Sequence, residues 1–361
     1  LGKVYLYQEK WQDAHDVLKT VIDSKEYKLM DNFGDVWSVD HNNNEESLFE
    51  VQYMYDGTYA LGGALSVITG SRNGPGDGWS WGQPTANLEQ AYIDAGDTER
   101  LRWTIIKTGC TEIAGENNFD EFVENSKNMA LYDTYIERYG WDPECYIIDP
   151  AQHKSARIVR KYFVPIEKRP EVYNIDKIPL DHRILRYADV LLMYAEAKME
   201  LNEIDDSVLE AINRVRARAY GVEVSATGQY PAVAEREQTK LRTIIRTERR
   251  MELAFEQLRY LDLYRWRIAE KVMNYPNYGL PAKNKARQDA YMQYWFHGAV
   301  PEIDESGCPD FSRTVKGEPS FFESQANKLS QRQFIAPKMY LWPIPNKTTE
   351  VMPNIENNTG Y

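Results

Sequence analysis

The chain has 361 residues, 42% of them hydrophobic and 27% charged, and its 43 Lys and Arg against 55 Asp and Glu give a net charge of −12. This length and composition are sufficient for a large buried core. The mean hydropathy is negative, and no run of about 18 uncharged apolar residues occurs, which excludes a membrane-spanning helix. An acidic chain repels phosphate backbones, so general nucleic-acid binding is excluded too.

Residues 1–30 carry the pattern of a helical hairpin. Apolar residues recur at helical spacing on both sides of a predicted turn at 8–10, among them Tyr5, Trp11, Ala14 and Leu18. Pairing bulky Trp11 with small Ala14 is typical of tetratricopeptide hairpins. Because one hairpin cannot bury its own apolar face, we expect partner helices elsewhere in the chain.

Residues 31–180 are predicted to form a loop-rich, ligand-facing lobe. Helical periodicity is weak there, and Gly, Asn and Asp cluster, most densely at 70–78. Short strands are predicted at 47–53 and 158–163, and a short helix at 88–93. Long loops in a compact domain are usually functional, so this lobe is where a ligand site is expected.

Residues 181–272 are the clearest helical region. An apolar stripe beginning at Leu185 and Ala188 and continuing to Met199 predicts one helix, and Asp205 or Asp206 caps the next. A long third helix is predicted from about 234–239 to about 255. The segment 273–361 returns to turns and isolated helical pieces.

Two glutamates, Glu248 and Glu252, stand on the inward stripe of the long helix, where leucines are expected. As an acid/base pair they would suit a glycoside hydrolase. As buried ion-pair anchors they would need partners, because an unpaired buried charge is costly. The sequence offers arginines for this role, so the structural interpretation is favoured, with Arg186, Arg259 and Arg265 as further anchors.

Four ordered blocks resemble the SusD/RagB family. They read RILRYADVLLMYAEA at 183–197, AINRVR at 211–216, ERRMELAFEQLRYLDLYRW at 248–266 and LWPIP at 341–345, followed by a family-like ending at 353–361. The resemblance implies a mainly α fold, in which tetratricopeptide-like hairpins form a scaffold that carries an irregular lobe with short strands and helices. It further implies one domain over 1–361 that lacks the N-terminal portion of the family, including its lipoprotein signal.

The same resemblance implies a function without catalysis or cofactor. Family members are lipid-anchored at the outer-membrane surface of Bacteroidota and lie over a SusC-like TonB-dependent transporter. They capture glycans, or in some members peptides, for import. For this chain we therefore expect oligosaccharide binding at the cell surface, with contact to the membrane only through an N-terminal lipid anchor outside the sequence. A peptide-capturing member and a glycoside hydrolase are the alternatives.

The ligand site is predicted first at Trp79 and Trp81. On an extended segment these two side chains share one face, and a sugar ring stacks on an aromatic plane while its hydroxyl groups bond to polar neighbours. Asn73, Asp77 and Gln83 are the polar candidates nearby. The alternative is that both indoles pack against the scaffold, and burial of Trp79, Trp81 and Trp295 together would instead indicate a protein-binding scaffold.

A second aromatic cluster, Tyr275, Tyr278 and Trp295, is a further candidate ligand surface. A third, at 132–139, falls on one helix face and is expected to belong to the core. No CxxC or paired-histidine motif supports a metal or redox site. A structural Ca²⁺ held by an acidic group is weighed against a solvated surface, the residues being Glu302, Asp304, Glu305 and Asp310.

Overall fold

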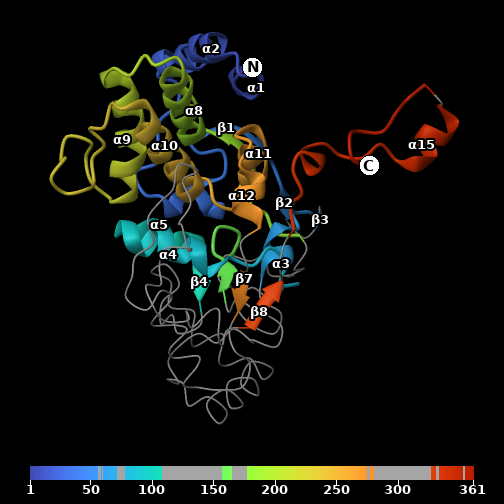
Figure 1. Cartoon of the computed structure of the whole chain (residues 1–361). Helices are drawn as coiled ribbons and strands as arrows, with labels where there is room; N and C mark the ends of the chain where they lie inside the picture. Colours follow the sequence, from blue (N-terminus) through green and yellow to red (C-terminus); the bar gives the residue numbers. More distant parts are fainter. Residues whose placement is uncertain are drawn as a thin grey trace, which may run out of the picture.

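In the computed structural model, the described residues are 1–55, 58, 60–70, 78–107, 157–164, 177–274, 277–279, 327–330, 333–352 and 354–361. Helices dominate them, and strands occur as short antiparallel pairs (Figure 1). The predicted fold class, a mainly α scaffold with an irregular lobe, is confirmed. None of the described helices combines the length and apolar character needed to cross a bilayer.

The helical layer contains the N-terminal hairpin and the family-like helices. Its members are α1 (Gly2–Tyr7), α2 (Trp11–Ser24), α8 (Tyr187–Glu200), α9 (Asp206–Ala219), α10 (Gln238–Glu252), α11 (Arg259–Arg265) and α12 (Ala269–Met273). The hairpin packs through α2 on α8, which also contacts α9 and α10. The helices that the hairpin needs as partners therefore come from a region almost 200 positions later in the chain.

The remaining elements are short. They are η1 (Gly34–Trp37), η2 (Val39–His41), β1 (Ser47–Val51), β2 (Met54–Tyr55), β3 (Ala60–Leu61), α3 (Leu65–Thr69), α4 (Ala86–Ala95), α5 (Thr98–Thr104), β4 (Ile105–Lys107), β5 (Arg157–Val159), β6 (His182–Arg186), β7 (Asn277–Gly279), β8 (Asn327–Ser330), η5 (Lys338–Tyr340) and α15 (Asn346–Val351). The strands pair β1–β6, β2–β3, β4–β5 and β7–β8. In β1–β6, Glu50 lies opposite Arg183 and Val51 opposite His182.

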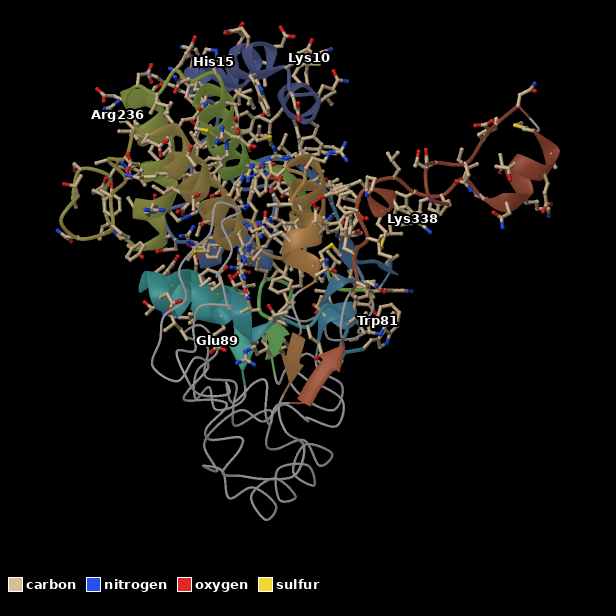
Figure 2. All side chains as sticks on the ribbon, in the orientation of Figure 1. Lys10, His15, Trp81, Glu89, Arg236 and Lys338 are labelled. Atoms are coloured by element: carbon tan, nitrogen blue, oxygen red, sulfur yellow. The ribbon has the colours of Figure 1, made fainter. Side chains whose placement is uncertain are left out.

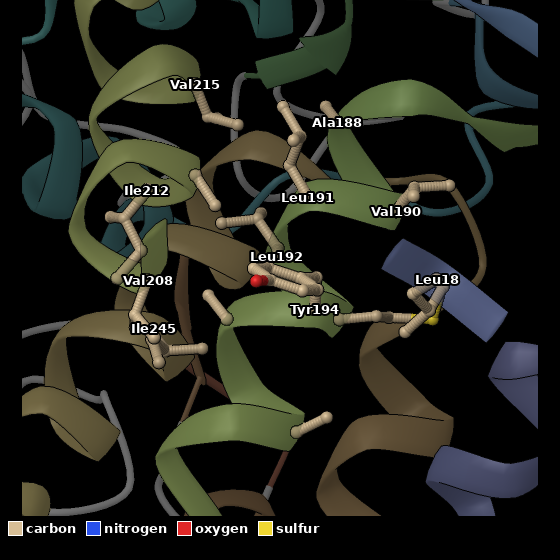
Figure 3. Packing of buried hydrophobic residues seen from close by; sticks show 14 of the residues in the cluster. Leu18, Ala188, Val190, Leu191, Leu192, Tyr194, Val208, Ile212, Val215 and Ile245 are labelled. Carbon is tan, nitrogen blue, oxygen red and sulfur yellow. The ribbon is translucent and has the colours of Figure 1, made fainter. Parts of the chain in front are cut away.

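Helix α8 lies at the centre of the main core, which explains its composition. Every residue from Tyr187 to Met199 is buried, because α2, α9 and α10 surround it. Figure 3 shows Leu191, Leu192 and Tyr194 of α8 between Leu18 of α2 and Ile212 of α9. Helix α8 is therefore buried on all sides, its charged residues Asp189 and Glu196 included, whereas α10 is strongly amphipathic and buries only one face.

The start of α8 differs from the prediction. The apolar stripe places Leu185 in the helix, but Leu185 belongs to β6 and pairs with Phe49, and the helix begins at Tyr187. Backbone pairing with β1 decides this local conformation, which periodicity alone does not detect.

The end of the long helix also differs from the prediction. Helix α10 ends at Glu252, and Phe255 lies beyond it with a φ of 66°. The start agrees better with expectation: Glu237 caps α10 by accepting bonds from the backbone N–H groups of Thr239 and Lys240 at 2.9 and 2.8 Å. Phe255 still packs against the core, so its apolar character is consistent with its position although its helical assignment is wrong.

Candidate functional site

Trp79 and Trp81 form an exposed aromatic pair on the loop between α3 and α4. Trp79 is 42% exposed and Trp81 is 60% exposed. Their ring centroids are 5.5 Å apart, and the ring planes are inclined at 59°. Figure 2 shows Trp81 at the outside of the described part of the chain. Large indoles that stay in solvent are available for stacking on a ligand.

The backbone of this loop is fixed by the end of α3. The N–H of Trp79 donates to the carbonyl of Val67 at 2.7 Å, and the N–H of Trp81 donates to that of Ile68 at 2.9 Å. These carbonyls belong to the last turn of α3, where helices leave acceptors unpaired. The bonds position the tryptophan pair on a regular element although it lies in a loop.

Gly78 is required for this close approach. A Cβ built on Gly78 would lie 2.3 Å from the carbonyl oxygen of Val67 and 2.6 Å from Cα of Gly70. Both are backbone atoms that cannot move aside like a flexible side chain. The glycine therefore permits the hydrogen bonds that hold the loop against α3.

The predicted extended conformation of the loop is wrong. Ser80, between the two tryptophans, has a φ of 62° in the left-handed region. A turn at that residue removes the alternation that an extended strand would impose. The rings nevertheless contact each other across this turn.

The other predicted ligand residues are only partly described. The Nε2 of Gln83 donates to the carbonyl of Ser80 at 3.1 Å and so braces the turn. Tyr278 lies in β7 opposite Lys328. Asn73, Asp77, Tyr275 and Trp295 lie outside the described residues, as do the acidic residues considered for Ca²⁺. Within the described ranges, no group of three or more His, Cys, Asp or Glu side chains is arranged to hold a metal ion.

Glu248 and Glu252 lie in a buried ion-pair network at the centre of the helical layer. Glu252 is 0% exposed and accepts from Arg186 at 2.6 Å, from Arg100 at 3.1 Å and also from Arg218. Glu248 accepts from Arg100 at 2.6 Å and Arg216 at 2.8 Å. We call this group the central network; its members are Glu46, Arg100, Arg186, Arg216, Arg218, Glu248, Glu252 and Glu256.

These contacts set the charge of both glutamates. Burial alone would raise the pKa of Glu248, but the charges of Arg100 and Arg216 outweigh it and lower that pKa. The pKa of Glu252 is likewise lowered, because Arg218, Arg186 and Arg100 outweigh burial. A general acid needs a raised pKa and access to substrate. The two glutamates have neither property, so they are not placed to cleave a glycosidic bond.

Arg186 connects the strands to the helices. Its guanidinium bonds to Glu46 at 2.6 Å and to Glu256 at 2.7 Å as well as to Glu252. Arg265 belongs to a neighbouring group: it pairs with Glu196 at 2.5 Å and with Asp262 at 2.8 Å, and Arg249 joins Asp189 to Asp262. Arg259 lies over the ring of Trp266 at 6.0 Å.

Sequence reasoning missed two cations of the central network. Arg100 comes from α5 and Arg218 from α9, and neither was among the candidate partners of the two glutamates. Arg218 could have been considered, because it lies two positions after the candidate Arg216 in the same predicted helix. For Arg100 there was no such indication, because its contact with Glu248 joins positions 148 residues apart.

The fold and the tryptophan pair together define a class: a helical, tetratricopeptide-like scaffold that displays an aromatic surface on a braced loop. The SusD family model matches residues 45–361, and the chain belongs to the SusD family. A SusD-like protein P2 of Formosa agariphila is 26% identical over 318 residues, which cover 84% of this chain and 55% of that protein. The chain thus spans about half the length of that relative.

Two solved structures share the fold. A SusD-like carbohydrate binding protein from Bacteroides fragilis superposes with a TM-score of 0.66 at 24% identity, covering 97% of this chain and 62% of that one. Surface glycan-binding protein A from Bacteroides thetaiotaomicron does so with a TM-score of 0.60 at 18% identity, covering 99% and 62%. At these identities the similarity demonstrates the fold alone.

Proposed function

We propose that this chain binds glycans without cleaving them, and that the tryptophan pair is a contact surface for the sugar. The observation that carries the proposal is the pair itself: two indoles in solvent, in mutual contact, on a loop that two hydrogen bonds anchor to α3. A preorganised aromatic surface binds with little loss of side-chain entropy. The names of the two solved relatives, one carbohydrate binding and one glycan binding, support the same ligand class.

The absence of catalysis is part of the proposal. Glu248 and Glu252, the carboxylates that the sequence offers for acid/base chemistry, are both paired with arginines in the central network. We further propose that the bound glycan is passed to a SusC-like TonB-dependent transporter at the outer-membrane surface, with a lipid anchor N-terminal to this sequence. Family membership supports this step.

A glycan array followed by calorimetry on the best oligosaccharide tests the ligand. Replacing both indoles, Trp79→Ala and Trp81→Ala, should weaken binding about tenfold or more, because buried aromatic anchors dominate interface energetics. Trp342→Ala is the matched control: that indole is 75% exposed on the C-terminal segment and should not matter. The melting temperature of each variant excludes unfolding as the cause.

Three outcomes would contradict the proposal. The first is equal glycan affinity in the double variant, which would remove the tryptophan pair from the site. The second is saturable binding of an unfractionated peptide pool with no glycan binding, which would favour the peptide-capturing alternative. The third is release of reducing sugar ends on incubation with a bound glycan, which would make the protein a hydrolase.

The transporter step is tested separately. The protein is expressed in a Bacteroidota host with a lipoprotein signal and a candidate SusC-like TonB-dependent transporter, and the outer membrane is solubilised in mild detergent. Co-purification in a defined ratio is expected. Recovery of the two proteins in separate fractions would contradict this step while leaving glycan binding untouched.

A further inference from the structure

A cavity of about 730 Å³ opens between α2, α8 and α9. Its lining includes Lys19 and Lys25 at the end of α2, Lys28 in the loop that follows, Tyr187 of α8 and Arg214 of α9. Pockets for small ligands are typically about 300–1,000 Å³. We call it the α2–α8–α9 pocket; its size suits one or two sugar units.

The lining of the pocket carries more basic than acidic side chains, although the chain as a whole is acidic. Four basic side chains line it against the carboxylates of Asp23 and Glu210, in a chain whose net charge is −12. A concave surface with an excess of positive charge concentrates anionic ligands. A site for a neutral ligand would not need this excess.

Two of the four cations have their charges balanced, and two do not. Lys19 pairs with Asp23 one turn along α2, and Lys28 pairs with Glu45 at 2.7 Å. Arg214 and Lys25 form no ion pair with any residue in the described part of the chain. Their positive charges therefore stay available to an incoming anion.

Arg214 is nevertheless held in place. Its guanidinium lies 5.3 Å from the ring centroid of Tyr187, and Nη1 donates to the Tyr187 hydroxyl at 3.3 Å. Tyr187 is itself buried in the main core. A guanidinium has five N–H donors, and only one is used here. A guanidinium held in one orientation with free N–H donors can bind a carboxylate or sulfate group through two parallel hydrogen bonds.

Lys25 is positioned by the backbone. It is the C-cap of α2 in the left-handed conformation, with a φ of 56°, and its N–H donates to the carbonyl of Ile22 at 3.4 Å. The conformation turns the chain at the mouth of the pocket. The lysine is exposed, which makes it a useful site for substitution.

Neutral polar groups complete the lining. The hydroxyls of Tyr194 and Ser207 lie 2.9 Å apart where α8 meets α9. Such hydroxyls can both donate and accept, as sugar hydroxyls require. Figure 2 shows His15, on α2, and Trp81 on widely separated parts of the molecule, so this pocket is distinct from the tryptophan pair.

We propose that the α2–α8–α9 pocket is a second, charge-selective site that binds an acidic sugar through its carboxylate or sulfate group. Arg214 binds the anionic group with its free N–H donors, and Lys25 adds charge at the mouth. The volume favours a sugar unit over a stretch of polypeptide. This inference goes beyond glycan binding at the tryptophan pair and does not depend on it.

Calorimetry with matched trimers tests the proposal. The probes are tri-galacturonate, its fully methyl-esterified neutral form, a sulfated galactose trimer and a glutamate-rich peptide of the same charge. Binding of an acidic trimer is expected, with the neutral ester at least about tenfold weaker, since hydrogen bonds to charged groups contribute about 1.5–3 kcal/mol. Comparing the carboxylated and sulfated trimers identifies the anionic group. About 1 M NaCl, where the Debye length is about 3 Å, should weaken the binding.

The variants are chosen to separate binding from folding. Arg214→Gln and Lys25→Glu should each reduce affinity for the acidic trimer by about tenfold. Lys25→Glu is exposed and leaves the core intact, so it remains informative if Arg214→Gln lowers the melting temperature. Lys240→Gln, an exposed lysine on α10, is the charge-matched control. Trp342→Ala, at an exposed indole outside both sites, should leave this binding unchanged. Loss of trimer binding in Trp81→Ala but in neither pocket variant would place the trimer at the tryptophan pair, which distinguishes failure here from failure of the proposed function.

The proposal is overturned by any of three results. Neither acidic trimer binds; an acidic trimer binds but both pocket variants retain full affinity; or the glutamate-rich peptide binds more tightly than either trimer. The last outcome would assign the pocket to an acidic polypeptide instead.

Discussion

The central network and the tryptophan pair both place side chains where their chemical type is uncommon. The network buries charged side chains, and the tryptophan pair exposes apolar ones. In the network, charged groups are buried, and Glu46, Glu248 and Glu252 are each bonded to two or more arginines. At the tryptophan pair, large apolar rings remain in solvent while their backbone N–H groups donate to carbonyls of α3. Buried charge requires partners to be stable at all. Exposed aromatic surface has no such requirement and is therefore available for a ligand.

The comparison indicates where a variant should affect stability and where it should affect binding. Network residues join α5, β6, α9 and α10, so their loss acts on the whole helical layer. The tryptophan rings contact each other, and both residues are exposed to solvent.

Acid should produce the largest loss of stability, because it acts on several buried carboxylates at once. Burial opposes ionisation of Asp189, Glu196, Glu248 and Glu252, but neighbouring arginines outweigh it and lower each pKa. A lowered pKa in the folded state stabilises it above the unfolded-state pKa of about 4 and loses that contribution as the pH falls. Burial raises the pKa of Asp97, so the contribution of this residue to stability changes with pH in the opposite direction.

Urea unfolding at a series of pH values from about 7 to about 3 measures this effect. The free energy of unfolding should fall steadily below about pH 4.5. A constant value across that interval would show that the network carboxylates are not stabilised by their arginines.

Glu252→Gln should be the most damaging single substitution of the set. It removes the charge that Arg100, Arg186 and Arg218 share, and leaves these buried cations with fewer carboxylates to balance them. The expected loss is about 3–5 kcal/mol. Glu203→Gln, an exposed glutamate in the turn after α8, is the control and should change the free energy of unfolding by less than about 0.5 kcal/mol. Equal effects for the two variants would refute a structural role for Glu252.

Gly78→Ala should have an intermediate effect and should lower both the free energy of unfolding and the affinity for glycan. The new methyl group would collide with the backbone of α3, at a cost of about 1–3 kcal/mol, and the displaced loop should bind glycan less well. Gly228→Ala has open space around its Cβ and serves as the matched control. If Gly78→Ala behaves like Gly228→Ala in denaturation and in binding, the loop is not held against α3 as described.

Trp81→Ala should have the smallest effect on stability. The indole is 60% exposed, and surface substitutions usually stay within about 0.5 kcal/mol. Thermal and chemical denaturation of the variant, beside its glycan affinity, sharpen the contrast with Glu252→Gln. A loss of more than about 2 kcal/mol would mean that the ring is a packing element rather than a ligand surface.

Much of the helical layer is predictable from sequence. The hairpin at 1–24, the cap at Asp205 and the start of α10 follow from apolar spacing and capping chemistry, which act within a few residues. Leu185 is different, since pairing with β1 holds it in a strand. Phe255 is different as well, because the chain leaves the helix before reaching it.

By itself, the sequence determined that two glutamates on an apolar stripe must have cationic partners, because the cost of burying charge is independent of the fold. It also determined the family, through blocks whose order and content are local properties of the chain. Only the tertiary structure decided that Arg100 and Arg218 are among those partners, and that Trp79 and Trp81 meet across a left-handed turn. Those facts depend on contacts between distant positions, which neither spacing nor composition specifies.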